Sequence, residues 1–175
     1  MTDRLTITLA QLNPVVGSIT GNIEKVRGAR EKAAIDNADL VVCSELVVSG
    51  YPPEDLVLKP FFLDKVEVAV NAFAQETADG GPAVLLTAPW RKDGKTYNAA
   101  LLLDGGEIRA VRFKHDLPNY GVFDEARVFE TGPMPGPIDF KGVRIGVPIC
   151  EDIWFPDVIA NMKEQGADLI VVTNG

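Results

Sequence analysis

Cys150 is the side chain in this sequence that is best placed to act as a nucleophile. It follows the apolar run Val143–Ile149 and precedes the turn Glu151–Phe155, after which a helix is expected to begin at Pro156. A nucleophile on a tight strand-to-helix turn is exposed at the end of a sheet. The dipole of the following helix also favours a thiolate. The alternative is that Cys150 is a small buried hydrophobe.

Glu45 and Lys114 occupy comparable positions at the ends of apolar segments. Glu45 follows Leu40–Cys43, and apolar surroundings penalise its charge and raise its pKa. A carboxylate in that setting is either paired or serves as a base that works near neutral pH. Lys114 ends the segment Ile108–Phe113, and considered alone it is a solvated charge.

The three side chains together predict cleavage of an amide. The thiolate of Cys150 attacks the carbonyl carbon, Glu45 takes the thiol proton and passes one to departing ammonia, and Lys114 stabilises the oxyanion. This chemistry requires no metal. The other cysteine, Cys43, lies inside a strand and is predicted to be buried. The one histidine, His115, is predicted to be structural or to face solvent.

The elements that must position these groups alternate between strands and helices. Hydrophobic periodicity predicts strands at 4–10, 40–43, 83–88, 96–103, 107–113, 143–149 and 167–173. It predicts helices at 22–36, at 61–78 and from Pro156 to Gly166. The segments 44–60 and most of 115–148 are rich in proline and glycine and are predicted to be loops.

Two similar segments suggest how the strands are layered. Ala38–Val42 and Ala167–Val171 both read Ala-Asp-Leu followed by two β-branched residues, and each follows a helix. They are either ordinary helix-to-strand junctions or parts of two sheets packed together with helices outside. The last predicted strand ends at Asn174-Gly175, so residues 1–175 are expected to be the N-terminal part of a domain in a longer protein.

Composition excludes several classes of protein. The chain has 175 residues, 17 basic and 25 acidic side chains, and a net charge of −8, which disfavours binding to a nucleic acid backbone. A hydrophobic content of 46% argues against disorder. There is no apolar run of about 18 residues to cross a membrane and no signal-peptide pattern. Two distant cysteines and one histidine make a metal cluster unexpected and predict a cytoplasmic, reduced protein.

Three motifs resemble the nitrilase (carbon–nitrogen hydrolase) superfamily. They are Pro148–Trp154 (PICEDIW), Ser44–Leu56 (SELVVSGYPPEDL) and Lys114–Glu125 (KHDLPNYGVFDE). Glutamate, lysine and cysteine in this order mark the superfamily. The stretches YPPEDL and LPNYGVFDE are similar to the N-terminal glutaminase domains of glutamine-dependent NAD⁺ synthetases, and the resemblance extends over essentially the whole chain.

The resemblance implies a fold and a set of site residues. The implied fold is α/β, a nitrilase-like α-β-β-α sandwich truncated at the C-terminus. Cys150 is implied as nucleophile, Glu45 as general base and Lys114 as oxyanion stabiliser, with Glu125 positioning the lysine and the substrate. The implied substrate-binding residues are aromatic: Tyr120, which would contact the substrate, and Tyr51, Phe123 and Trp154, which would line the pocket.

The resemblance also implies a reaction and its partners. L-glutamine would be hydrolysed through a cysteine thioester, and the ammonia would serve ATP-dependent amidation of deamido-NAD⁺ by a synthetase domain of the same parent chain. No cofactor is expected for the glutaminase domain, and ATP and Mg²⁺ are expected only in the absent synthetase domain. A cytoplasmic homo-oligomer is expected, with no nucleic acid or membrane partner. The alternatives are a free-standing nitrilase-type amidase that acts on another small amide and a non-catalytic oligomerisation scaffold.

Overall fold

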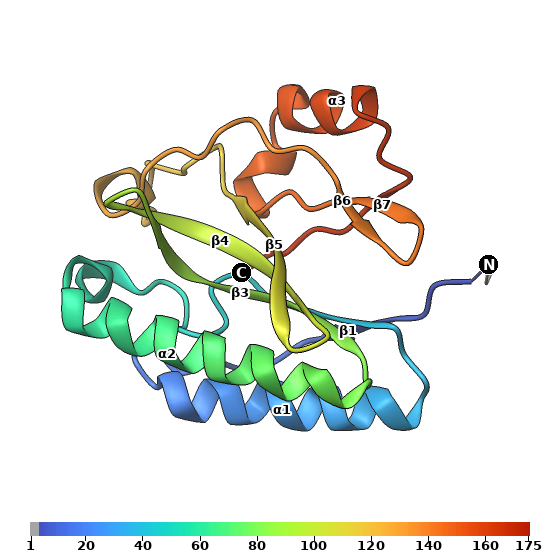
Figure 1. Cartoon of the computed structure of the whole chain (residues 1–175). Coiled ribbons are helices and arrows are strands. Elements are labelled where there is room, and N and C mark those ends of the chain that lie inside the picture. Colours follow the sequence, from blue (N-terminus) through green and yellow to red (C-terminus); the bar gives the residue numbers. More distant parts are fainter. Residues whose placement is uncertain (1–3) are drawn as a thin grey trace.

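The computed structural model describes residues 4–175, which contain both helices and strands (Figure 1). The helices are α1 (Ile19–Ile35), α2 (Pro60–Glu76) and α3 (Pro156–Glu164). The strands are β1 (Ile7–Ala10), β2 (Leu40–Cys43), β3 (Ala83–Lys92), β4 (Lys95–Asp104), β5 (Glu107–Phe113), β6 (Ile138–Phe140), β7 (Val143–Gly146) and β8 (Leu169–Ile170). Short 3₁₀ helices span Glu54–Leu58, Thr77–Asp79, Glu125–Arg127 and Cys150–Ile153.

The strands form two sheets. The larger has the order β1-β2-β3-β4-β5, in which β1, β2 and β3 are parallel and the β3–β4 and β4–β5 pairs are antiparallel. The smaller has the order β6-β7-β8, with β7 and β8 parallel. Beyond β7 and β8 an isolated parallel bridge joins Ile149 to Thr173. This bridge carries the pairing of the smaller sheet up to the residue before Cys150.

Strand β2 is apolar at every position because it is covered on both faces. Side chains alternate across a strand, so Leu40 and Val42 face one way and Val41 and Cys43 the other. Leu40 and Val42 belong to a core between the two sheets, which also holds Ile145 from β7. Val41 and Cys43 belong to a second core, which the helices α1 and α2 cover.

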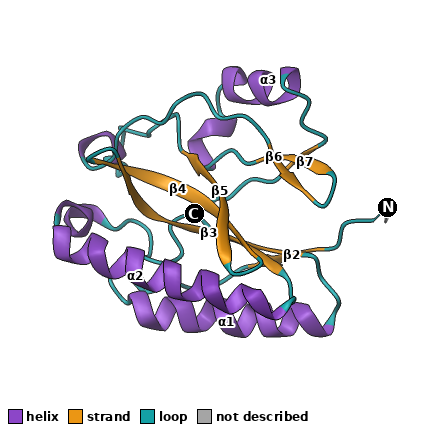
Figure 2. Cartoon of the chain, in the orientation of Figure 1, coloured by secondary structure: helices purple, strands orange, loops and turns teal. Residues whose placement is uncertain are grey.

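The layers run helix, sheet, sheet, helix (Figure 2). Helices α1 and α2 lie side by side on the outer face of the larger sheet, and α3 lies beyond the smaller sheet. Met162 of α3 is fully buried and packs against Gly146, where an added Cβ would come within 2.8 Å of the Met162 sulfur. The predicted α/β class and its layering are therefore confirmed. Within the described residues, no helix is both long and apolar enough to cross a membrane.

The hairpin of β3 and β4 is longer than the sequence analysis predicted. The strand predicted to end at residue 88 continues to Lys92, and Trp90 pairs with Tyr97 across the turn. The turn is Asp93-Gly94, and both residues have positive φ, as a tight two-residue hairpin requires. Pro89 concealed this continuation, because proline normally marks the end of a central strand.

The remaining differences lie at element ends. Helix α1 begins at Ile19 rather than residue 22, since the buried side chain of Ile19 extends its apolar face. The strand predicted at 143–149 ends at Gly146, because Pro148 has no N–H to donate to the ladder. The last strand, predicted at 167–173, covers only Leu169–Ile170, because its partner β7 ends before Pro148. Strand β6 lies in a segment that was predicted to be loop, because its three residues are too few to show a hydrophobic periodicity.

Candidate active site

Lys114 lies at the centre of a buried ion network at the end of β5. Its side chain is fully buried, which is rare for lysine unless it is paired. The ammonium Nζ donates to Glu45 Oε1 at 2.7 Å and to both oxygens of Glu125, at 2.9 and 3.0 Å. Glu45 and Glu125 are also buried. The structure therefore brings together three of the predicted residues from segments up to 80 positions apart.

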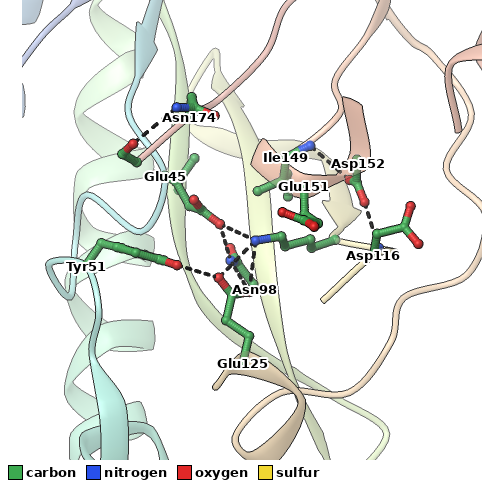
Figure 3. A network of polar contacts seen from close by, with 12 residues as sticks. Glu45, Tyr51, Asn98, Asp116, Glu125, Ile149, Glu151, Asp152 and Asn174 are labelled. Atoms are coloured by element: carbon green, nitrogen blue, oxygen red, sulfur yellow. Dashed lines mark hydrogen bonds and ion pairs between the residues drawn. The ribbon is translucent and has the colours of Figure 1, made fainter. Parts of the chain in front are cut away.

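Asn98 of β4 bridges the two carboxylates. Its amide Nδ2 donates to Glu45 Oε1 at 2.8 Å and to Glu125 Oε2 at 3.3 Å, and its side chain is fully buried. Figure 3 shows Asn98 between the two glutamates. Oxygen Oε1 of Glu45 thus accepts from both the lysine and the amide. Within residues 4–175, the other oxygen, Oε2, is buried and has no hydrogen-bond partner.

The ionisation of the network is set by burial and by charge. Burial raises the pKa of Glu45, and the charge of Glu125 raises it further, while Lys114 opposes both. Burial is also the largest influence on the pKa of Lys114 and lowers it, but the two carboxylates together outweigh it and raise that pKa. The predicted rise in the Glu45 pKa is therefore confirmed. The lysine stays positive, and the glutamate can exchange a proton at higher pH than an exposed one.

Cys150 sits on the strained turn that its sequence context predicts. It has φ of +45°, a left-handed conformation that a non-glycine residue adopts at a cost, and it begins the 3₁₀ helix Cys150–Ile153. Its N–H donates to the carbonyl of Thr173 at 2.9 Å. The same terminal segment reaches the other sheet, where the N–H of Glu45 donates to the carbonyl of Asn174 at 3.2 Å. The segment Thr173–Asn174 therefore lies between Cys150 and Glu45 and bonds to the backbone of both.

Gly175 shows how close the groups lie. Its backbone N–H lies near the Cys150 sulfur and lowers the pKa of the thiol, although burial outweighs this effect. A Cβ built on Gly175 would lie 3.0 Å from Glu45 Oε2 and 3.4 Å from the ring of Tyr51. Glu45 Oε2 and the Tyr51 ring thus lie against the residue that also influences the pKa of the Cys150 thiol.

The Cys150 thiol is protonated at neutral pH. Burial raises its pKa, and the charge of Glu45 raises it further, to about 11, although Lys114 acts in the opposite direction. The expectation that a helix dipole would favour a thiolate was wrong for this resting structure. The 3₁₀ turn Cys150–Ile153 separates the cysteine from α3, and burial and the neighbouring carboxylate determine the pKa of the thiol. A base must therefore remove the proton when the thiol reacts.

The predicted aromatic residues differ in their surroundings. Tyr51 is half-buried, and its hydroxyl donates to Glu125 at 3.0 Å. Tyr120 is 57% exposed, and its hydroxyl donates to both oxygens of Glu151 at 3.1 Å. Phe123 packs against both tyrosine rings, and with Tyr51 and Glu125 it lines a cavity of about 240 Å³.

Trp154 and the two residues predicted to be structural lie outside this network. Trp154 is 72% exposed, and its predicted part in a pocket stays a prediction. Cys43 is fully buried in the core, and burial raises its thiol pKa to about 12. His115 is half-buried, and its ring Nδ1 lies 2.7 Å from the carbonyl of Gly132. The predicted burial of Cys43 is therefore confirmed. Of the two settings predicted for His115, structural or facing solvent, its contact with Gly132 favours the first.

Three buried polar residues of the site were missed by the sequence analysis. They are Asn98, Glu151 and Asp152. Asn98 is a lone amide before the apolar run Ala99–Leu103, and that contrast was the available signal. Glu151 and Asp152 follow the nucleophile candidate directly, where acidic residues also suit the solvated start of a helix. In the described part of the chain, no three His, Cys, Asp or Glu side chains are grouped to hold a metal ion.

Comparison with protein families and curated proteins identifies relatives whose matched segments include all of the candidate site residues. A family model described as carbon-nitrogen hydrolase matches residues 6–175. Glutamine-dependent NAD(+) synthetase of Rhodobacter capsulatus is 43% identical over 175 residues, 100% of this chain and 32% of the relative. A relative of the same name from Thermotoga maritima is 44% identical over 153 residues, 87% of this chain and 26% of the relative. The chain thus spans about a third of the length of the relatives it matches.

Solved structures give the same picture. Glutamine-dependent NAD+ synthetase from Acinetobacter baumannii in complex with adenosine diphosphate has a TM-score of 0.91 at 35% identity, over 98% of this chain and 32% of that one. An amidase from Nesterenkonia sp. has a TM-score of 0.82 at 24% identity, over 97% of this chain and 64% of that one, and so shows a shared fold alone. The resemblance drawn from the three motifs is therefore confirmed.

Proposed function

Because this chain belongs to the carbon–nitrogen hydrolase family, we propose that Cys150, Glu45 and Lys114 hydrolyse an amide. The observation that carries the proposal is the division of labour at Glu45. One carboxylate oxygen is fixed by Lys114 and Asn98, while the other is buried near the protonated thiol and has no hydrogen-bond partner in the described part of the chain. A strongly perturbed, buried cluster beside a nucleophile is typical of a catalytic site.

The reaction follows from these positions. Glu45 Oε2 accepts the thiol proton as the Cys150 sulfur forms a bond to the amide carbon. Lys114 Nζ stabilises the negative oxygen of the tetrahedral intermediate. The C–N bond then breaks, and the proton held by Glu45 passes to the departing ammonia. Glu45 next takes a proton from water, which attacks the thioester and releases the acid and the free thiol.

Glu125 keeps the lysine in place for this chemistry. It contacts Nζ with both oxygens, and Tyr51 donates to one of them. With Glu45 this gives the ammonium three carboxylate contacts, and these keep it charged and fix its direction. Glu125 is thus a positioning residue, as the family resemblance implies.

We further propose that the amide is L-glutamine and that the ammonia serves synthesis of NAD⁺. The support is the printed name of the relatives, glutamine-dependent NAD(+) synthetase, together with 43% identity across the whole chain. The transfer of ammonia to deamido-NAD⁺, with ATP and Mg²⁺, would take place in the synthetase domain of a longer protein. A cytoplasmic location and homo-oligomeric assembly belong to the same proposal. Tyr120, Phe123 and Trp154 are proposed to line the approach of the glutamine.

The test is hydrolysis of a panel of small amides by the full-length protein. We expect glutamine to be preferred, ammonia release to respond to ATP and deamido-NAD⁺, and Cys150→Ala to abolish it while Cys43→Ala does not. A preference for another amide, without that response, would indicate a free-standing amidase. A glutamine-like electrophile that labels Cys150 no better than Cys43 would indicate a non-catalytic scaffold.

A further inference from the structure

Asp152 is a fully buried carboxylate two residues after Cys150. Its oxygens accept three backbone N–H groups. Oδ1 accepts from His115 at 2.9 Å and from Asp116 at 2.8 Å, and Oδ2 accepts from Ile149 at 2.9 Å. Figure 3 shows Asp152 between Ile149 and Asp116. All three partners are donors, which favours the ionised, acceptor-only carboxylate. Burial acts in the opposite direction and raises the pKa of Asp152 despite these three bonds.

The three N–H groups belong to the two segments that carry the reacting groups. Ile149 immediately precedes Cys150, and His115 and Asp116 immediately follow Lys114. The first segment continues the smaller sheet, and the second continues β5 of the larger sheet. A single carboxylate therefore ties the sulfur-bearing turn to the lysine-bearing loop.

The same carboxylate holds the strained turn closed. The N–H of Asp152 donates to the carbonyl of Ile149 at 3.1 Å, while the N–H of Ile149 donates back to Asp152 Oδ2. Cys150, with its positive φ, lies inside this reciprocal pair. A strained conformation persists when its surroundings over-determine it. Loss of Asp152 would allow Cys150 to relax away from the position that faces Glu45.

We propose that Asp152 is a positioning residue that sets the Cys150 sulfur and the Lys114 ammonium at the spacing needed to act on one carbonyl group. The inference rests on the proposed function, since those two groups must meet the same substrate. Asp152 itself does not touch the substrate. Its three hydrogen bonds fix the backbone beside Cys150 and Lys114. We therefore expect the loss of Asp152 to lower the rate of reaction more than the affinity for the substrate.

The test is Asp152→Asn in the full-length protein. Asparagine has nearly the same shape as aspartate, but its NH₂ group would face a backbone N–H, and two donors cannot form a hydrogen bond. Displacement of catalytic groups by about 1 Å costs about 100-fold, so we expect kcat for glutamine to fall about 10- to 100-fold, with KM changed less than about twofold. The matched control is Asp168→Asn, whose exposed carboxylate accepts the N–H of Arg144 at 2.9 Å, at the opposite end of β7 and β8 from Cys150. It should leave kcat unchanged.

Alkylation by iodoacetamide provides a readout that does not need turnover. Mass spectrometry resolves Cys150 from the buried Cys43, and we expect the rate at Cys150 to fall about tenfold in Asp152→Asn and to stay unchanged in Asp168→Asn. Asp152→Glu, which keeps the charge and both acceptor oxygens, should recover part of both rates. A lowered unfolding midpoint with wild-type kcat and wild-type alkylation would overturn the proposal. Failure of both Asp152→Asn and Asp152→Glu to fold would also overturn the proposal, since the carboxylate would then be needed for folding itself.

The alkylation arm separates this inference from the proposed function. If the wild-type protein does not hydrolyse glutamine but Cys150 is selectively alkylated, the proposed substrate fails, and the Asp152 effect is still read from the alkylation rates. If Cys150 is labelled no faster than Cys43 in the wild-type protein, the proposed function fails at the nucleophile itself, and the positioning role falls with it.

Discussion

At the level of single residues, the site assigns different tasks to the two oxygens of one carboxylate. Glu45 Oε1 accepts from Lys114 and Asn98, so its place is fixed. Among residues 4–175, Oε2 has no hydrogen-bond partner, which leaves it available for the proposed role as base toward the thiol. Asn98 is central to this arrangement, because its hydrogen bond also lowers the pKa of Glu45 against the effect of burial.

Replacement of Asn98 by leucine should shift the pH profile of the reaction. Without the amide donor the pKa of Glu45 rises further, so the base is protonated at higher pH. The acid limb of kcat/KM should therefore move to higher pH. General base catalysis contributes about 100-fold or more, so we expect kcat/KM near neutral pH to fall about 10- to 100-fold. Asn161→Leu, which removes a bond to the carbonyl of Pro135 away from the site, is the control. An acid limb that stays in place would contradict this role.

The two tyrosines should separate binding from turnover. Tyr120 contacts Glu151, beside the nucleophile at the exposed side of the site, whereas Tyr51 contacts Glu125, which holds the lysine. A hydrogen bond is worth about 0.5–1.5 kcal/mol, or about 2- to 10-fold. Tyr120→Phe should raise KM for glutamine by that factor and leave kcat near wild type. Tyr51→Phe should lower kcat instead. Steady-state measurement of kcat and KM for both variants tests this prediction. A lower kcat for Tyr120→Phe and a higher KM for Tyr51→Phe would contradict it.

At the level of elements, periodicity predicted most helices and strands because their side chains face defined layers. β2 was recognised as a strand covered on both faces since every residue is apolar, and that is how it packs. The misses have local causes. Pro89 hid the continuation of β3, although Asp93-Gly94 was a hairpin signal, and β6 is too short for a pattern. Close backbone approaches, such as that at Gly132, leave no trace in hydrophobic periodicity.

Gly132 should be intolerant of a side chain because it packs against the end of β5. Its N–H donates to the carbonyl of Lys114 at 2.8 Å, and an added Cβ would lie 2.6 Å from Phe113 Cβ and 2.7 Å from that carbonyl oxygen. Overpacking costs about 1–3 kcal/mol, so Gly132→Ala should lower the free energy of unfolding by that amount. It should also lower kcat, since the backbone that must move carries Lys114.

Gly28 in helix α1 is the matched control for this prediction. Among the described residues, no atom lies within 4 Å of a Cβ built there, and alanine is favoured over glycine in a helix by about 1 kcal/mol. Gly28→Ala should therefore keep or raise stability and leave activity unchanged. Urea denaturation and glutamine hydrolysis measure both variants. Equal effects of the two substitutions would show that the close approach at Gly132 has no energetic consequence.

At the level of the whole molecule, the site exists because two sheets present their ends to each other. Strand-end positions predicted the meeting of Glu45 and Lys114, because both follow strands of the larger sheet. Cys150 follows the smaller sheet instead, so a shared edge does not explain its approach to them. The hydrogen bonds of Asn98 and Asp152 were beyond prediction, since they depend on how the sheets are stacked and on backbone groups that carry no sequence signature. The buried charge balance also emerges only in the assembled fold, where one ammonium faces two carboxylates.

Removal of that ammonium should destabilise the protein in a pH-dependent way. Lys114→Met leaves Glu45 and Glu125 buried without their cation, and breaking a buried pair costs about 3–5 kcal/mol. We expect the free energy of unfolding at pH 7 to fall by about that amount. Without the lysine, which lowers the pKa of Glu45, that pKa rises further in the folded state. The folded variant then binds more protons than the unfolded chain, so its deficit shrinks as pH falls toward about 5.

Urea denaturation of the variant and the wild-type protein across this pH range measures the deficit. Lys141→Met is the control, because Lys141 forms an exposed pair with Asp39 at 2.6 Å, and such pairs contribute about 0–1 kcal/mol. Its effect should be small at every pH. A deficit for Lys114→Met that stays constant from pH 7 to pH 5 would mean that lost packing, and not unpaired carboxylates, destabilises the variant. The two sheets meet around a buried ammonium and two carboxylates that are costly to leave unpaired. This arrangement supports the proposed catalytic role more than a role in stability alone.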